Sequence, residues 1–126
     1  RIQFFKEKKA ACVVSIHQNS FPNEAQHGAQ TFYYTGSKDG ENLAASIQKS
    51  LLTIDSTNTR KEKSSDIYYL LKHSDVPSVI VECGFLSNPE ETAKLTDSNY
   101  QKKIAYSISL GICTYFKTQH TGRTAP

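Results

Sequence analysis

The stretch PSVIVECGFLSNPEE, residues 77–91, predicts a buried strand that is followed at once by a helix. Residues 78–81 are a short apolar run rich in β-branched side chains, which is typical of a central strand in a parallel sheet. The helix start is indicated by Asn88 as the N-cap, Pro89 at the first helical position and Glu91 as the second half of a capping box. The stretch therefore predicts one strand–helix unit of an α/β domain.

Two further strands and a helix are predicted upstream of this stretch. ACVVSI (residues 11–16) is a second apolar run, and AQTFYYT (residues 29–35) is rich in threonine and aromatic residues and ends at the turn signal GSKDG. From Glu41 the pattern changes, because apolar residues recur at spacings of four, four and three, which places them on one helical face. These residues are Leu43, Ile47, Leu51 and Ile54.

The other segments differ in how clearly they predict structure. Residues 55–66, DSTNTRKEKSSD, are polar and predict a flexible surface stretch, and residues 67–71, IYYLL, predict an extended segment. A long amphipathic helix is predicted from about Asp97, whereas residues 119–126 carry no core-forming pattern and predict a disordered tail. The apolar residues of this helix recur at intervals of four, at Tyr100, Ile104, Ile108, Ile112 and Phe116.

Strands that alternate with helices predict an α/β fold, with a mainly parallel sheet flanked by helices in three layers. The length of 126 residues, 37% of them hydrophobic, fits a single domain, to which we assign residues 1–118. The net charge of +3, with both signs interspersed, indicates no nucleic-acid partner. The three cysteines lack CxxC spacing and are interpreted as buried small residues. No signal peptide is visible, and no apolar run approaches the roughly 18 residues of a membrane-spanning helix.

Two side chains capable of chemistry follow predicted strands at their carboxyl ends, where α/β sheets bind ligands. His17 is suited to hold a divalent metal, and Glu82 is suited to transfer a proton at the edge of a zinc site. The residues alone leave a plainer interpretation open for each of them. His17 would then be a polar side chain with its hydrogen bonds satisfied, and Glu82 would form an ion pair with a lysine or arginine.

Further candidates are weaker. Asn19 and Ser20 would either orient His17 or contact substrate, or they would simply form a turn. Arg60 would either bind an anionic group of a substrate or belong to a solvated charged loop. A nucleophilic role for Cys83 is disfavoured, because neighbouring side chains on a strand point to opposite faces and Glu82 occupies the candidate face.

Five motifs taken together carry a resemblance. SIHQNSF, GAQTFYY, LAASIQKSL, PSVIVECGFLSNPEE and YQKKIAYSISLGICTYF occur in the order and spacing of the zinc-dependent N-acetylmuramoyl-L-alanine amidases of the amidase-3 type. The similarity runs from about Ala10 to Phe116. The residues of the motifs most resemble those of the germination-specific, spore-cortex branch of that family. The resemblance implies that His17 is a zinc ligand and that Glu82 is the catalytic glutamate.

The resemblance also implies an activity and a setting. The reaction is hydrolysis of the amide bond between the lactyl group of N-acetylmuramic acid and L-alanine in peptidoglycan, as the first step toward muramic-δ-lactam in the spore cortex. The implied cofactor is one Zn²⁺ per complete catalytic domain. Peptidoglycan is the implied partner, together with an accessory lipoprotein that aids metal loading. The implied location is outside the cytoplasm, in the cell envelope or the forespore intermembrane space.

The sequence departs from the family at its start. Amidases of this type begin with a strand and a DPGHGG-like loop that carries a first zinc histidine, followed by a glutamate ligand on the next helix, and neither segment occurs here. A catalytic zinc usually has three protein ligands, and one is present. We therefore expect the C-terminal part of a catalytic domain that lacks its first strand and helix and is inactive on its own, without bound zinc.

Two consequences follow from that expectation. A domain without its first strand exposes a sheet edge, which predicts pairing with another chain as a dimer. The incomplete metal site also supports an alternative from a different functional class. In this alternative the chain is a catalytically silent module that keeps the amidase fold and binds peptidoglycan or regulates another protein.

Overall fold

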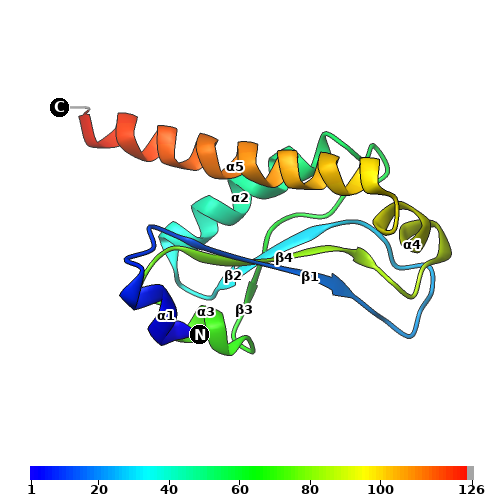
Figure 1. Ribbon diagram of the computed structural model, residues 1–126, viewed down its shortest axis with the longest axis horizontal. Coiled ribbons are helices and arrows are strands. Elements are labelled where there is room, and N and C mark those ends of the chain that lie inside the picture. The colour runs from blue at the N-terminus through cyan, green and yellow to red at the C-terminus, as the bar shows by residue number, and fades with distance from the viewer. Residues whose placement is uncertain (125–126) are drawn as a thin grey trace.

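The computed structural model describes the backbone of residues 1–124 and the side chains of residues 1–119 (Figure 1). One sheet contains the strands β1 (Val13–Asn19), β2 (Gln30–Tyr34), β3 (Lys63–Ser65) and β4 (Ser78–Phe85). The helices are α1 (Ile2–Glu7), α2 (Lys38–Leu52), α3 (Tyr69–His73), α4 (Pro89–Leu95) and α5 (Ser98–Thr124). The predicted strands at 11–16, 29–35 and 78–81 and the predicted helices are therefore confirmed, with shifted bounds.

The strand order of the sheet is β1-β4-β2-β3. β1 pairs with β4 and β2 pairs with β3 in parallel, whereas β2 and β4 run antiparallel. The sheet is thus mixed, with parallel pairs in the majority, as the prediction of a mainly parallel sheet requires. β4 lies between two partners, which explains why its sequence is an almost continuous apolar run and why all of its residues are buried.

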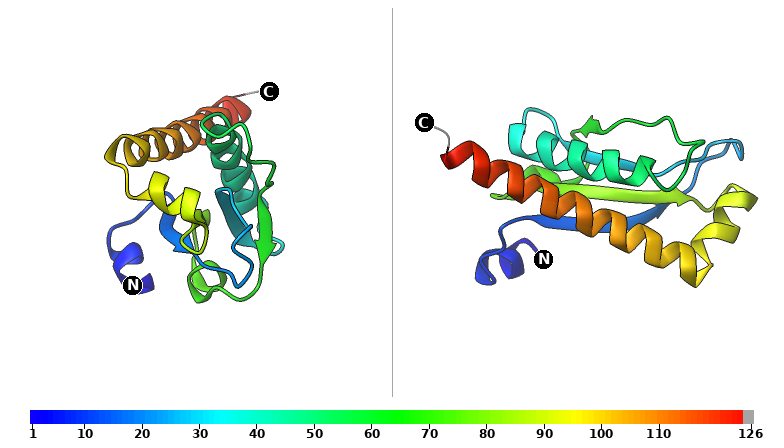
Figure 2. Two further views of the ribbon diagram at one scale, coloured as in Figure 1. Left: turned by 90° about the vertical axis from the view of Figure 1, so that its right-hand side faces the viewer. Right: turned by 90° about the horizontal axis from the view of Figure 1, so that it is seen from above.

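The helices cover the two faces of the sheet unequally (Figures 1 and 2). α2 and α5 pack against each other and cover one face, where they meet the inward side chains of β4. On the other face, the described part of the chain places only the short helices α1 and α3, near one end. The predicted third layer is therefore present only as these two helices. The core between the sheet and α2 is formed by fully buried side chains, Leu43, Ile47, Leu51, Val79 and Val81.

Two segments differ from their predictions. Residues 63–65, expected to be part of a flexible surface stretch, form β3, which pairs with β2. The sequence carried no strand signal because β3 is short and its side chains are largely exposed. Residues 67–71, expected to be extended, include the start of α3, in which Leu71 is buried. A run of five apolar residues does not distinguish a strand from a helix, and here tertiary packing decided for the helix.

The C-terminal helix is longer than predicted. α5 begins at Ser98, close to the expected Asp97, and continues to Thr124. The disorder expected for residues 119–126 is therefore not seen as far as Thr124, and residues 125–126 lie outside the described residues. The domain boundary at residue 118 remains a prediction. Within the part of the chain that is described, no helix has the length and apolar character needed to cross a membrane.

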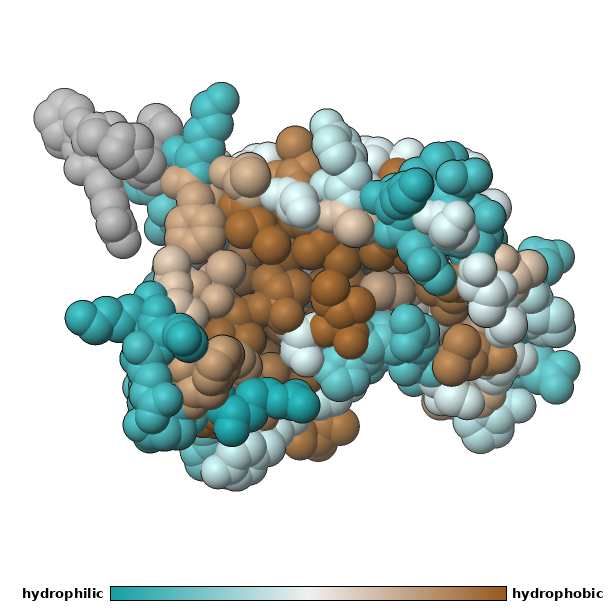
Figure 3. All heavy atoms as spheres, viewed as in Figure 1, coloured by the Kyte–Doolittle hydropathy of each residue, from teal (hydrophilic) through white to brown (hydrophobic). Residues whose placement is uncertain are grey.

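β1 is an edge strand of the sheet among the described residues. On the side of the molecule shown in Figure 3, hydrophobic side chains gather between β1 and α5. Ile16 of β1 is 57% exposed there, and a groove beside it is lined by Cys83, Ile104 and Ile108. The predicted pairing of this edge with another chain remains a prediction.

The N-cap of α4 is present as predicted, but the capping box is only half formed. The side chain of Asn88 accepts hydrogen bonds from the backbone N–H groups of Glu90 (2.9 Å) and Glu91 (3.1 Å). Glu91 does not return a bond to Asn88. Its buried carboxylate instead accepts a hydrogen bond from the backbone N–H of Gly28 at 2.5 Å and so ties α4 to the loop before β2.

Replacing Asn88 with alanine is expected to lower the free energy of unfolding by about 1 kcal/mol, because two N–H groups at the start of α4 lose their acceptor. Chemical denaturation of the variant and the parent protein measures this difference. Asn99→Ala, at an exposed position of α5, is the control and should change stability little. Equal stabilities of the two variants would contradict the capping role of Asn88.

Candidate functional site

His17 and Glu82 are neighbours on adjacent strands. In the parallel pairing of β1 with β4, His17 lies directly beside Glu82. Gln30 of β2 is paired with Glu82 from the other side. Paired residues of a sheet point to the same face, so these three side chains form a row across the sheet. Val81 and Cys83 alternate with Glu82 and point into the core, which places the row on the face that α2 and α5 leave uncovered.

The two residues lie within their strands rather than beyond the strand ends. β1 continues for two residues after His17, and β4 continues to Phe85. The expectation that both side chains stand at the tips of the strands is corrected accordingly. The parallel register, and not the strand ends, brings the two side chains together.

Glu82 is a buried carboxylate with an unused acceptor. The residue is 8% exposed, and its Oε2 atom has no hydrogen-bond partner among the described residues. Burial raises the pKa of Glu82, and the nearby positive charge of protonated His17 opposes that rise. No lysine or arginine of the described residues forms an ion pair with it, so the plainer interpretation of Glu82 as an ion-pair residue finds no support.

His17 is exposed on the edge strand and is held by its own strand. The Oγ atom of Ser15 and the Nε2 atom of His17 form a hydrogen bond of 2.7 Å. Ser15 precedes His17 by two residues, so both side chains leave the same face of β1. Sequence reasoning missed Ser15, although this spacing on a predicted strand was visible. A metal ion bound at Nε2 would take the place of this serine contact.

Asn19 is the last residue of β1, and Ser20 follows it outside the strand. The Oδ1 atom of Asn19 accepts a hydrogen bond of 2.8 Å from the backbone N–H of Ser20. The backbone carbonyl of Asn19 accepts another from Leu86, also at 2.8 Å, where the register between β1 and β4 shifts. No hydrogen bond of the described residues joins either side chain to His17. A contact of these two residues with substrate remains a prediction.

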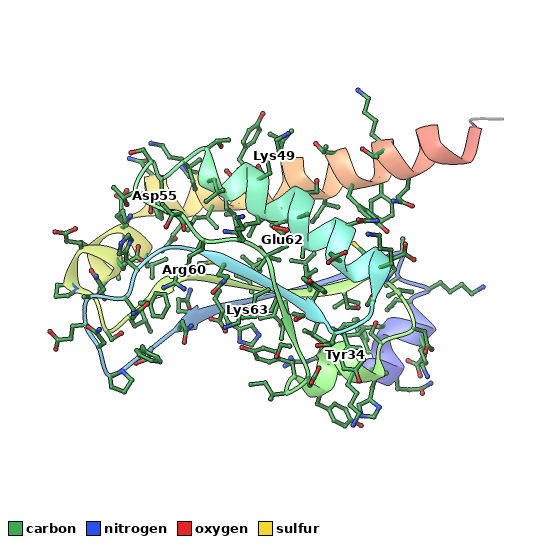
Figure 4. The ribbon with its side chains drawn as sticks, turned by 180° about the vertical axis from the view of Figure 1, so that it is seen from behind. Tyr34, Lys49, Asp55, Arg60, Glu62 and Lys63 are labelled. Carbon is green, nitrogen blue, oxygen red and sulfur yellow. The ribbon has the colours of Figure 1, made fainter. Side chains whose placement is uncertain are left out.

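Arg60 lies in the loop between α2 and β3, but its half-buried side chain is held against the sheet (Figure 4). Its guanidinium donates to the backbone carbonyl of His27 at 2.7 Å, to Gln26 at 2.8 Å and to Gln30 at 3.3 Å. It also lies over the ring of Phe85, 4.8 Å from the centroid. All three acceptors are neutral, so these contacts leave its positive charge uncompensated. Arg60 therefore holds the segment that leads to Gln30, beside Glu82.

The described residues supply only part of a metal site. No three of their histidine, cysteine, aspartate and glutamate side chains converge to a point where a metal could be held. His17 fits one ligand position, and Glu82 fits a carboxylate beside it. A complete three-ligand site needs donors that the described residues do not supply.

The cysteines play no part in this site. Cys83 is buried in the core between the sheet and the helices, and burial raises the pKa of its thiol to about 11. It is protonated at neutral pH and points away from Glu82, as the alternation of the strand predicted. Cys12 and Cys113 form no disulfide. The interpretation of all three as buried holds only for Cys83, because Cys12 is half-buried and Cys113 is exposed on α5.

Comparison with protein families and curated proteins identifies a consistent set of relatives. The model of the Amidase_3 family, described as N-acetylmuramoyl-L-alanine amidase, matches residues 1–114. The germination-specific N-acetylmuramoyl-L-alanine amidase of Bacillus subtilis (strain 168) is 38% identical over 116 residues, which cover 92% of this chain and 49% of that protein. The amidase LytC of the same organism is 30% identical and is covered to 24%.

Solved structures show the same similarity in three dimensions. The CwlD amidase from Clostridioides difficile, solved in complex with the GerS lipoprotein, is 44% identical with a TM-score of 0.90. The match covers 92% of this chain and 59% of that one. An N-acetylmuramoyl-L-alanine amidase from Clostridium difficile 630 is 28% identical with a TM-score of 0.86, covering 92% of this chain and 63% of the other. The chain thus spans about half the length of its first curated relative.

Proposed function

The chain belongs to the amidase-3 family of N-acetylmuramoyl-L-alanine amidases, and from this premise we propose that it carries part of the active site of such an enzyme. The reaction is hydrolysis of the amide bond between the lactyl group of N-acetylmuramic acid and L-alanine in peptidoglycan, in the maturation of the spore cortex. The observation that carries the proposal is the pair of His17 and Glu82, placed in register with one buried carboxylate oxygen unpartnered.

Glu82 is the residue that moves protons in this proposal. Its free Oε2 accepts a proton from the water that attacks the amide carbonyl, and the same carboxyl group then gives the proton to the departing amine of L-alanine. The raised pKa supports the second step, because a more basic carboxylate holds the proton until the leaving group takes it. Gln30, fixed by Arg60, borders the carboxylate from β2.

His17 is proposed as one ligand of a catalytic zinc ion, with the remaining ligands supplied from outside the described residues. Zinc, when bound, would polarise the amide carbonyl and lower the pKa of a bound water. The position of His17 beside Glu82 supports this role, because the two side chains then act on one substrate group from neighbouring strands.

Zinc content tests the ligand role. Elemental analysis after dialysis of a protein that carries the complete amidase domain is expected to show less zinc in His17→Ala than in the parent protein. His73→Ala is the matched control, because His73 lies in α3 and packs on Tyr69, away from the row. Equal zinc in His17→Ala and the parent would contradict the proposal.

The test of activity is the appearance of new amino-terminal L-alanine when a protein that carries the complete amidase domain is incubated with zinc and peptidoglycan. Release that depends on Glu82 would support the proposed function. No release from peptidoglycan, combined with binding to it, would favour the alternative of a catalytically silent peptidoglycan-binding or regulatory module. The observation that favours this alternative is that the described residues form no complete metal site.

A lipoprotein is the proposed accessory partner. The similar CwlD amidase was solved in complex with the GerS lipoprotein, which supports a partner of this kind here. A substrate in the cell wall supports a location in the cell envelope, including the space between the forespore membranes. Aid in metal loading by the lipoprotein is part of the same proposal.

A further inference from the structure

Tyr68 does not belong to a strand, but its side chain packs on the face of the sheet that carries His17 and Glu82. It is the residue before α3, and its backbone is extended (φ −87°, ψ 115°). Its ring lies against Phe32, with centroids 5.8 Å apart and planes at 54°. Phe32 is paired with Ile80 of β4, two residues before Glu82, so the aromatic pair and the carboxylate share one face.

Through its contact with Phe32, which is paired with Ile80, Tyr68 lies near Glu82 on this face. Burial raises the pKa of Tyr68, and the negative charge of Glu82 raises it further. The phenol is therefore protonated at neutral pH and offers a neutral hydrogen-bond donor. Tyr33, on the same strand as Phe32, differs in this respect, because its hydroxyl donates to Glu41 at 3.0 Å.

The site therefore combines a hydrogen-bond acceptor with a hydrogen-bond donor. Glu82 has a buried acceptor atom without a partner among the described residues. Tyr68 supplies a donor from the neighbouring loop, and its ring is braced by Phe32. A substrate amide bound between them would find an acceptor for the proton of the attacking water and a donor for its own carbonyl oxygen.

We propose that Tyr68 is a further catalytic residue, whose hydroxyl donates a hydrogen bond to the carbonyl oxygen of the scissile amide. The inference rests on the amidase function proposed above. No bond to Tyr68 forms or breaks, and the phenol keeps its proton throughout. The hydrogen bond strengthens as water adds to the carbonyl carbon, because the oxygen then gains negative charge.

Tyr68→Phe is the decisive variant, because it removes the hydroxyl and keeps the ring against Phe32. In a protein that carries the complete amidase domain, we expect kcat for a disaccharide–peptide fragment of peptidoglycan to fall about tenfold or more, with KM changed less than about twofold. Tyr69→Phe is the matched control. Tyr69 is the next residue, is 71% exposed and packs on His73, so its kcat should equal that of the parent protein.

A binding measurement distinguishes a catalytic role of Tyr68 from a role in substrate binding alone. In a Glu82→Gln background, where the fragment is not cleaved, Tyr68→Phe should change its Kd less than about twofold. Equal kcat for Tyr68→Phe and Tyr69→Phe would overturn the inference, and so would a tenfold weaker Kd, which would assign Tyr68 to substrate binding alone. Absence of hydrolysis by a parent protein that carries the complete amidase domain, or full turnover by its Glu82→Gln variant, would instead overturn the amidase function itself.

Discussion

Glutamine in place of Glu82, in a protein that carries the complete amidase domain, is expected to reduce the release of peptides with amino-terminal L-alanine from peptidoglycan at least about 100-fold. The amide of glutamine has nearly the shape of the carboxylate, but it cannot accept a proton from water and return it to the leaving amine. The position of the side chain is set by the pairing of β4 with β1 and β2, which the substitution leaves intact. The zinc content should be unchanged, because the metal ligand in this proposal is His17.

Glu90→Gln is the matched control for this loss of activity. Glu90 lies at an exposed position in the first turn of α4, and its substitution removes the same charge from the protein. Activity close to that of the parent protein is expected for Glu90→Gln. A Glu82→Gln protein that still cleaves peptidoglycan at a comparable rate would refute the catalytic role of Glu82.

The same Glu82→Gln substitution should stabilise the fold at neutral pH. The folded-state pKa of Glu82 is raised, so this carboxyl group contributes stability below its unfolded-state pKa and loses that contribution as the pH rises through its folded-state pKa. Glutamine is neutral at every pH, so the variant does not lose stability through ionisation at this position. Removing this buried negative charge, whose Oε2 atom has no partner among the described residues, should raise the free energy of unfolding by about 1 kcal/mol at pH 7. Denaturation at pH 7 and pH 4 tests this, since the gain should shrink at the lower pH.

Gly111→Ala is expected to destabilise the protein by about 3 kcal/mol, through the contact between α5 and α2. A Cβ atom at this position would lie 2.6 Å from the Cα atom of Ile47 and 3.0 Å from its backbone nitrogen. Ile47 is fully buried, and the Oγ atom of Ser46 donates to the carbonyl of Gly111 at 2.6 Å. The helices would have to separate, and this cost outweighs the roughly 1 kcal/mol that alanine gains over glycine in a helix.

Thermal unfolding measures the effect of Gly111→Ala. A fall in Tm of about 10 °C is expected for a domain of this size. Cys113→Ala, two residues further along α5 at an exposed position, is the control and should leave Tm nearly unchanged. An unchanged or higher Tm for Gly111→Ala would show that helix propensity, and not the close approach of the two helices, decides at this position.

The predictions from sequence succeeded where a segment carries its own signal. The apolar run of β4, the cap at Asn88 and the apolar spacing of α2 and α5 each depend on residues close together in the chain, and each is present in the structure. The motifs around His17 and Glu82 likewise identified the candidate site and the family. The roles of these two residues remain proposals.

Other features depend on contacts between distant segments. β3 has no hydrophobic pattern and exists because its backbone pairs with β2. Arg60 stood in a charged stretch, and only its contacts with His27, Gln30 and Phe85 place it against the sheet. Tyr68 could not be assigned to the site before α3 and its packing on Phe32 were known.

The sequence by itself therefore determined the main strands and helices, the family and the two residues on which the proposed chemistry depends. The tertiary structure decided the register that places His17 beside Glu82, the burial that leaves Oε2 of Glu82 without a partner, and the approach of Tyr68. The physical reason is that helical periodicity and capping act over a few residues. Strand pairing and desolvation instead depend on which distant segments meet in the folded chain.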